Sequence, residues 1–147
     1  MTTTHKDIET IQDEIIEEFS LFENPMDRYE YIIDLGKEMP PLDDKYKVEE
    51  NVVKGCQSTV WLWAYNKDGK IYFEADSDTV ITKGIIALLI RVLSGHTAEE
   101  IMHADLRFID GIDLRSHLSS QRSNGLNAMI KQMKFYAVAL NKQNGGK

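Results

Sequence analysis

Residues 57–75 read QSTVWLWAYNKDGKIYFEA. Val, Trp, Tyr, Ile and Phe dominate both halves of this stretch, and such residues favour β-strands. The polar run from Asn66 to Gly69 between the halves is typical of a hairpin turn. With the strand-like residues 51–54 that precede it, the stretch predicts a small antiparallel sheet of strands 51–54, 57–65 and 70–75. Neither face of the central strand is wholly polar, so we expect helices to cover at least one face.

Two helices are predicted before this sheet. The apolar residues that recur at helical spacing in the first are Ile8, Ile11, Ile15, Ile16 and Phe19. The acids on its opposite face are Glu9, Asp13, Glu14, Glu17 and Glu18. With Thr4 and Asp7 as a capping pair, the pattern predicts an amphipathic helix whose acidic face is solvated, with a docking patch as the alternative. A second helix is expected from Asn24 as N-cap to Gly36 as stop, followed by an exposed loop over 42–50.

More helices are predicted after the sheet. One begins at a cap on Asp76 or Ser77, ends at Gly95 and is apolar nearly all round, so we expect it to be the buried central helix. Thr97 and Glu100 form a capping box for a short helix that ends near His103. Residues 108–117 suggest another short helix or turn, and a long helix starts near Ser119. Its apolar stripe is Leu126, Met129, Ile130, Met133, Ala137 and Leu140.

Together these elements predict an α+β fold, with a small antiparallel sheet packed against several helices. We expect a single domain over residues 1–141 and a disordered tail over residues 142–147.

Composition narrows the function. The 147 residues include 42% hydrophobic residues, enough for one domain to bury a core, and no apolar run long enough to cross a membrane. The net charge of -7 argues against nucleic-acid binding, which needs clustered Lys and Arg. The polar, acidic N-terminus does not resemble a secretory signal, and a lone cysteine suits a reducing compartment. We therefore expect a cytoplasmic protein with no membrane or nucleic-acid partner.

The only cysteine, Cys56, is the candidate reactive residue. A lone cysteine is more often a buried, inert residue, but Gly55 before it can adopt positive φ and predicts a hairpin tip. A tip is a poor place to hide an apolar side chain, and Lys54 nearby would favour the thiolate. Without a second cysteine, dithiol redox chemistry within one chain is excluded, whereas carrying sulfur as a persulfide remains open.

Two alternatives to a sulfur carrier stay open at this point, and a third, a metal site, is only weakly supported. His5, His96, His103 and His117 show no ligand spacing with Cys56, so no metal site is expected. A cysteine hydrolase would need His103 or His117 to approach Cys56 in space. A non-catalytic interaction module would use the aromatic and acidic faces instead. Phosphate-binding glycine-rich loops are missing from the sequence.

The cysteine lies in a recognisable pattern. Its strongest part is Gly-Cys-Gln-Ser-x-Val-Trp over residues 55–61. The other parts are Leu35-Gly36 followed by Pro40, Ser77-Asp78 with Lys83-Gly84, and Arg122 with Asn124-Gly125-Leu126. In this order and spacing, the chain resembles the SufE family of sulfur acceptor proteins, which includes the closely similar CsdE type.

The resemblance implies a fold similar to SufE and to iron-sulfur scaffold proteins of the IscU kind. It implies that Cys56 accepts persulfide sulfur, with Gly55, Gln57, Ser58, Asp78 and Arg122 in supporting roles. Asp78 could equally complement a helix N-terminus, and Arg122 could be a structural ion-pair residue.

The resemblance also implies partners. The sulfur donor would be a pyridoxal-phosphate cysteine desulfurase of the SufS or CsdA kind, which the protein would stimulate. The recipient would be an iron-sulfur scaffold complex such as SufBCD, or another acceptor in a CsdE-type relay. The protein would be an accessory sulfurtransferase without a cofactor of its own, either a monomer or a homodimer.

Overall fold

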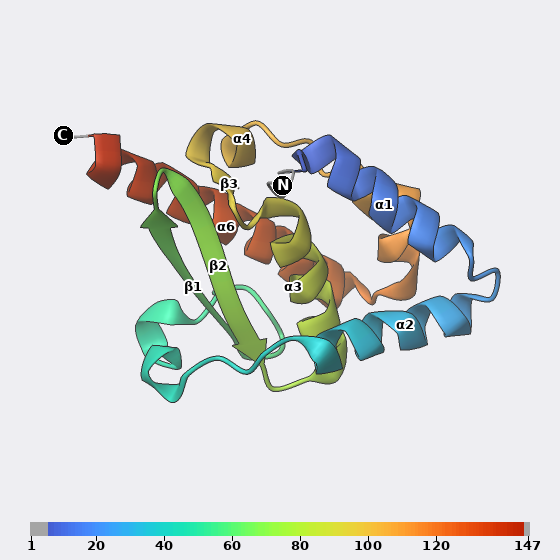
Figure 1. Ribbon diagram of the computed structural model, residues 1–147. Coiled ribbons are helices and arrows are strands. Elements are labelled where there is room, and N and C mark those ends of the chain that lie inside the picture. Colours follow the sequence, from blue (N-terminus) through green and yellow to red (C-terminus); the bar gives the residue numbers. More distant parts are fainter. Residues whose placement is uncertain (1–5, 146–147) are drawn as a thin grey trace.

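The computed structural model describes residues 6–145, in which helices pack against a three-stranded antiparallel sheet with strand order β1-β2-β3 (Figure 1). The predicted α+β class is therefore confirmed. The strands are β1 (Val60–Lys67), β2 (Lys70–Ser77) and β3 (His96–Thr97). The helices are α1 (Ile8–Ser20), α2 (Pro25–Glu38), α3 (Val80–Leu93), α4 (Ala98–Met102), α5 (Phe108–Gly111) and α6 (Ser120–Gly145). Short 3₁₀ turns are η1 (Asp44–Tyr46), η2 (Glu49–Asn51) and η3 (Leu114–His117).

The predicted hairpin is present as β1 and β2, which pair from Val60 opposite Ser77 to Lys67 opposite Lys70. Asp68 and Gly69 between them both have positive φ, as a two-residue type I′ turn requires. The first predicted strand is wrong. Residues 49–51 form η2, and Val52 makes only an isolated bridge to Trp61.

The third strand, β3, follows α3 along the chain and pairs with β2. Gly95 turns the chain at a φ of +83° and donates its N–H to the Ile71 carbonyl at 2.7 Å. His96 and Thr97 then pair with Ile71 and Lys70. The sheet thus has the predicted number of strands, but one of them comes from a segment that no local pattern marked as a strand.

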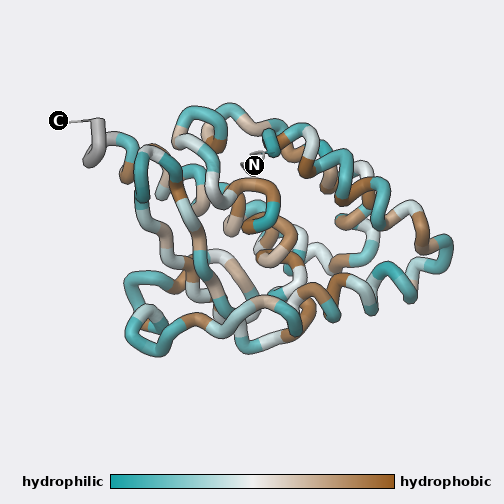
Figure 2. The backbone as a smooth tube through the Cα atoms, in the orientation of Figure 1, coloured by the Kyte–Doolittle hydropathy of each residue, from teal (hydrophilic) through white to brown (hydrophobic). Residues whose placement is uncertain are grey.

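Helix α3 is the buried centre, as predicted, and lies between the sheet and the α1–α2 pair (Figure 1). Hydrophobic positions concentrate along it, whereas α1 and α2 alternate between hydrophobic and hydrophilic positions (Figure 2). Its N-cap is Thr79, whereas Asp76 and Ser77 complete β2, so the predicted cap was misplaced. The chain needs those residues to finish pairing with β1 before it can turn.

Gly36 does not stop α2, which continues to Glu38. It lies inside α2 because α3 passes there at close range: a Cβ atom built on Gly36 would be 2.5 Å from the Gly84 backbone nitrogen. A Cβ on Gly84 would collide with the Ile32 carbonyl oxygen of α2. Two glycines on facing helices therefore set the α2–α3 crossing.

Most local helix signals are confirmed. Asn24 caps α2 by accepting from the Met26 N–H, and Thr97 with Glu100 forms the capping box of α4. Asp7 caps α1 by accepting from Thr10, whereas Thr4 lies outside the described residues. The stripe of α6 faces the core, with Leu126, Met129, Met133 and Ala137 buried and Ile130 and Leu140 packed against it.

One surface expectation is wrong. Leu42, at the start of the predicted exposed loop, is 4% exposed and buried. The acids of α1 lie at the surface, as predicted, and most of them are ion-paired within the chain. Arg107 binds Glu9 and Asp13, Arg91 binds Glu18, and Lys6 binds Glu14. The predicted disordered tail overlaps the end of α6, which continues to Gly145; residues 146–147 lie outside the described range, and disorder of the tail stays a prediction.

Candidate functional site

Cys56 lies on a loop that leads into β1. The Val53 N–H donates to the Val60 carbonyl at 2.8 Å and closes the base of this loop. Gly55 has a φ of +95°, which confirms the positive φ that was expected before Cys56. The loop therefore has a hairpin-like neck, although only one of its arms is a strand.

The thiol points inward, toward α6. Its Sγ atom donates to the Gly125 carbonyl oxygen at 3.6 Å, and the side chain is half-buried. Burial raises the pKa of the Cys56 thiol. Lys54 was expected to favour the thiolate of Cys56, but its ammonium group pairs with Glu49 instead. In this position Cys56 is a protonated thiol and a poor nucleophile.

A small pocket adjoins the thiol, with a free volume of about 10 Å³. Its lining is Cys56, Gln57, Ser58, Thr82, Ile85, Gln121, Arg122, Gly125 and Met129. Three segments far apart in sequence supply these residues: the Cys56 loop, α3 and the first turns of α6. Gly125 exposes only backbone to the sulfur, since a Cβ atom there would lie 3.5 Å from Sγ.

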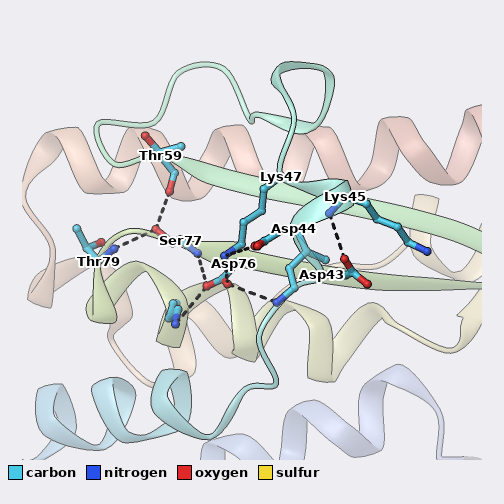
Figure 3. Close-up of polar contacts among 10 residues, drawn as sticks. Asp43, Asp44, Lys45, Lys47, Thr59, Asp76, Ser77 and Thr79 are labelled. Atoms are coloured by element: carbon cyan, nitrogen blue, oxygen red, sulfur yellow. Dashed lines mark hydrogen bonds and ion pairs between the residues drawn. The ribbon is translucent and has the colours of Figure 1, made fainter.

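The end of the Cys56 loop is fastened to the β2–α3 connection. Ser77 donates its hydroxyl to the Thr59 carbonyl at 2.8 Å (Figure 3), and Asp78 accepts from the Thr59 N–H at 3.2 Å. Asp78 is exposed and does not line the pocket. Its place in the structure is thus that of a loop anchor.

A cluster of hydroxyl groups lies under the pocket. Thr79 donates to the Ser58 hydroxyl at 3.1 Å or to the Thr82 hydroxyl at 2.8 Å, since one proton serves one acceptor at a time. Thr82 also lies 3.4 Å from Ser58. Sequence reasoning had singled out Ser58 alone; Thr79 and Thr82 carry no motif, and only their helical spacing of three residues links them.

The buried carboxylate of Asp76 also stabilises the β2–α3 connection. Asp76 binds Lys47 at 3.1 Å and Lys83 at 3.2 Å, as well as the backbone N–H groups of Ser77 and Leu42 (Figure 3). Burial by itself raises the pKa of Asp76. The hydrogen bonds from Ser77, the two lysines and Leu42 outweigh it, so the net pKa lies below its ordinary value. Sequence reasoning missed this cluster because its members are spread over the loop, β2 and α3.

Arg122 is half-buried at the start of α6 and lines the pocket. Its backbone N–H binds the Ser119 hydroxyl, but no hydrogen bond or ion pair of its guanidinium occurs among the described residues. The structural alternative, an ion-pair residue, thus finds no partner within residues 6–145. Gln57 lines the pocket beside Arg122, whereas Gly55 shapes the loop without lining it.

The histidines named as hydrolase bases lie elsewhere. His103 is exposed at the end of α4, and His117 lies in a separate shallow pocket with Pro25, Met26 and Tyr29. Neither lines the Cys56 pocket or bonds to its sulfur. The geometry therefore gives a cysteine hydrolase neither of these bases. Within residues 6–145, no group of three or more His, Cys, Asp or Glu side chains gathers as a metal site would require.

Comparison with known proteins places the chain in a family. Residues 13–137 match the SufE family, described as an Fe-S metabolism associated domain. The chain belongs to the SufE family. This membership implies a role in iron-sulfur metabolism as a sulfur acceptor.

Relatives support the assignment along most of the chain. An uncharacterised SufE-like protein of Rhizobium meliloti is 41% identical over 133 residues, which is 87% of this chain and 95% of the relative. SufE-like protein 1 of Arabidopsis thaliana, named as chloroplastic/mitochondrial, is 40% identical over 86% of this chain, but the match spans only 34% of that longer protein. A SufE-like protein of Synechocystis is 37% identical over 85% of this chain and 79% of its own length.

A solved structure supports the fold. The solution structure of a hypothetical protein from Thermus thermophilus superposes with a TM-score of 0.74, covering 90% of this chain and 96% of that one. Its sequence identity is 19%, so the likeness concerns the fold alone. In the described part of the chain, no helix is both long and apolar enough to cross a membrane.

Proposed function

We propose that Cys56 accepts one sulfane sulfur atom from the persulfide of a pyridoxal-phosphate cysteine desulfurase and passes it on for iron-sulfur cluster assembly. The observation that carries the proposal is a lone thiol on a closed loop, turned against Gly125 beside a small pocket. Family membership supplies the cargo. The pyridoxal phosphate belongs to the partner, and this chain works as an accessory sulfurtransferase.

The chemistry is an exchange at sulfur. The Cys56 thiolate attacks the outer sulfur of the donor persulfide, the donor sulfur–sulfur bond breaks, and the donor cysteine leaves as a thiolate. The Cys56 proton goes to solvent or to that leaving thiolate. Because burial raises the pKa of Cys56, the loop must first move the thiol out of its pocket. Arg122 at the pocket rim is a cation that can attract the negative outer sulfur.

The surroundings of Cys56 suit a residue that carries sulfur. A resting thiol that is protonated and half-buried resists small oxidants and alkylating agents. The absence of a second cysteine means that no thiol within the chain can attack the persulfide and release its sulfur. We propose that these exchanges take place in the cytoplasm, whose reducing conditions keep a solitary thiol available.

Mass spectrometry tests the proposal. The protein is incubated with a cysteine desulfurase from the same genome and free cysteine, and we expect the mass of one sulfur atom added at Cys56. The variant Cys56→Ser keeps the size of the side chain and should lose both the adduct and the stimulation of the desulfurase. No adduct with any desulfurase of that genome would refute the carrier function. Undiminished stimulation by Cys56→Ser would favour a non-catalytic interaction module.

A further inference from the structure

We propose that the free edge of β2 at Ala75 binds a short extended segment of a partner polypeptide. The segment adds to the sheet as one more antiparallel strand and carries an apolar residue followed by a basic one. None of the residues at this edge lines the Cys56 pocket. Binding here therefore does not depend on the sulfur chemistry proposed above.

The hydrogen bonds of the sheet leave this edge of β2 open. Alternate residues of a strand point their backbone groups to opposite edges. The Leu62 carbonyl of β1 accepts from the Tyr136 hydroxyl and so points away from β2. Ala75 stands opposite Leu62, and its N–H and carbonyl therefore point away from β1. No hydrogen bond of these two Ala75 groups occurs among residues 6–145.

The open stretch is short, because both of its ends are closed within the chain. At one end, the Phe73 N–H donates to the Ser94 hydroxyl at 3.0 Å. At the other end, the Ser77 N–H donates to the Asp76 carboxylate at 2.8 Å. Ala75 between them is 2% exposed, so water reaches its backbone groups poorly. A polypeptide that supplies one carbonyl and one N–H would satisfy both groups.

A groove with a volume of about 310 Å³ adjoins this edge. It is lined by residues 39–42, by Phe73, Glu74 and Ala75 of β2, and by Ile90 of α3. The segment after α2 passes the end of β2 here, where the Leu42 N–H binds Asp76 (Figure 1). Pro40 and Pro41 in this segment have no backbone N–H, so they cannot donate to the Ala75 carbonyl themselves. The lining is apolar apart from Glu74, which suits a strand with an apolar side chain.

The residues around Ala75 indicate which strand fits. One residue of an antiparallel strand can exchange both hydrogen bonds with Ala75. The side chain of that residue would lie on the face that α3 covers, near Ile90, and should be apolar. The next residue would stand opposite Glu74, which is exposed and has no ion pair among residues 6–145. Opposite charges favour each other across strands, so this next residue should be Lys or Arg.

A second copy of this chain is a poorer occupant of the edge. If two β2 strands paired antiparallel through Ala75, Glu74 of each copy would stand opposite Asp76 of the other. Like charges in directly opposite positions are destabilising. The charge pattern therefore favours a different polypeptide.

The test titrates isotope-labelled protein with the blocked hexapeptide Ser-Thr-Val-Arg-Thr-Ser and follows the backbone amides by NMR. We expect saturable shift changes centred on Glu74, Ala75 and Asp76, with a dissociation constant of roughly 1 mM or below. Methylation of the valine nitrogen removes the donor to the Ala75 carbonyl and should weaken binding about tenfold. The peptide with glutamate in place of arginine should also bind more weakly than the parent.

Variants of the protein test the same contacts from the other side. Ala75→Pro removes the outward N–H and spares the β1–β2 ladder, so it should weaken binding of the parent peptide about tenfold. Glu74→Lys should reverse the charge preference, so that the glutamate peptide binds better than the arginine peptide. Glu30→Lys, at an exposed position of α2, is the matched control and should keep the native preference.

Three results would overturn the proposal. The first is no shift change around Ala75 at millimolar peptide. The second is equal binding of the methylated and unmethylated peptides to native protein, a comparison that needs no variant to fold. The third is a dimer of native protein in analytical ultracentrifugation that Ala75→Pro dissociates, which would assign the edge to a second copy. Loading of Cys56 with sulfur is measured separately, so failure of either proposal leaves the other standing.

Discussion

At the scale of single residues, Cys56 and Asp76 both lie out of solvent to some degree, but their pKa values shift in opposite directions. Cys56 is half-buried with one weak partner, the Gly125 carbonyl, so burial favours its neutral form. Asp76 is more deeply buried yet surrounded by donors, and it keeps its charge. Burial thus disfavours the nucleophilic form of Cys56, whereas Asp76 stays charged and binds the neighbouring backbone.

The reactivity of Cys56 should depend on pH in a way that reports its burial. Because its pKa is raised in the folded protein, the thiolate forms only above the pH at which an exposed thiol ionises. We expect the rate of alkylation by iodoacetamide to stay low at neutral pH and to rise at higher pH than in urea-unfolded protein. Superimposable pH profiles for folded and unfolded protein would contradict a sheltered thiol.

Asp76→Asn should destabilise the fold by about 2 kcal/mol, because it leaves two lysines without their shared carboxylate. The pKa of Asp76 is lowered on folding, so its contribution is present above the unfolded pKa and is lost as pH falls through the folded pKa. Urea unfolding should therefore show the full difference from native protein at neutral pH and a shrinking one below about pH 4. Asp34→Asn, on an exposed position of α2, is the control and should change little.

At the scale of elements, two contacts position the site: the close crossing of α2 with α3, and the fastening of the Cys56 loop to the β2–α3 connection. The first fixes α3, which supplies Thr82 and Ile85 to the pocket. The second fixes the loop relative to α3. Backbone hydrogen bonds at Val53 and Thr59 bound residues 54–58, which under the proposed function would move once Ser58 leaves Thr79.

Gly84→Ala should cost about 3 kcal/mol or more, since its methyl group would collide with the backbone of Ile32 and the helices would have to separate. Thermal or urea unfolding measures the loss. Gly111→Ala is a suitable comparison, because its methyl group would meet only side-chain atoms of Ile16. An equal loss in both variants would show that the α2–α3 backbone contact is not the cause.

Thr79→Val should loosen the Cys56 loop while keeping the shape of the side chain. It removes the donor to Ser58 and Thr82, at a cost of about 1 kcal/mol. We expect faster alkylation of Cys56 at fixed pH. Ser116→Ala, which removes an exposed hydroxyl on η3, should leave that rate unchanged. Equal rates in Thr79→Val and native protein would mean that the hydroxyl cluster does not restrain the loop.

At the scale of the whole molecule, the candidate site lies on one loop at the edge of a helical core. The net charge of -7 is distributed so that much of the α1 acidity is neutralised internally by Arg91 and Arg107. Arg122 lines the same pocket as Cys56, and no ion pair of its guanidinium occurs among residues 6–145.

Docking of the desulfurase should expose Cys56. We expect a bulky maleimide to modify the free protein slowly. Modification should be faster in the presence of a desulfurase whose own nucleophilic cysteine is replaced, so that it binds but cannot react. Arg122→Ala should reduce this enhancement if the guanidinium contacts the partner or its persulfide. Equal labelling rates with and without the desulfurase would argue that the loop opens on its own.

Local signals in the sequence predicted much of this molecule. The caps at Asn24 and Thr97, the hairpin around Asp68-Gly69 and the apolar stripe of α6 depend on residues a few positions apart. Such patterns act through the backbone and need no knowledge of distant segments. The family resemblance likewise depended on short motifs in a fixed order, of which the stretch around Cys56 is the strongest.

Local sequence patterns could not predict the contacts between distant segments. Cys56 meets Gly125 across 69 positions, Asp76 gathers Lys47 and Lys83 from different elements, and β3 pairs with β2 after an intervening helix. A glycine such as Gly36 reads as a stop until the facing helix is known. The sequence by itself thus determined most helices, the β1–β2 hairpin and the candidate residue Cys56. Only the tertiary structure decided that this sulfur is sheltered and how much space lies beside it, because packing brings α3, α6 and the Cys56 loop together.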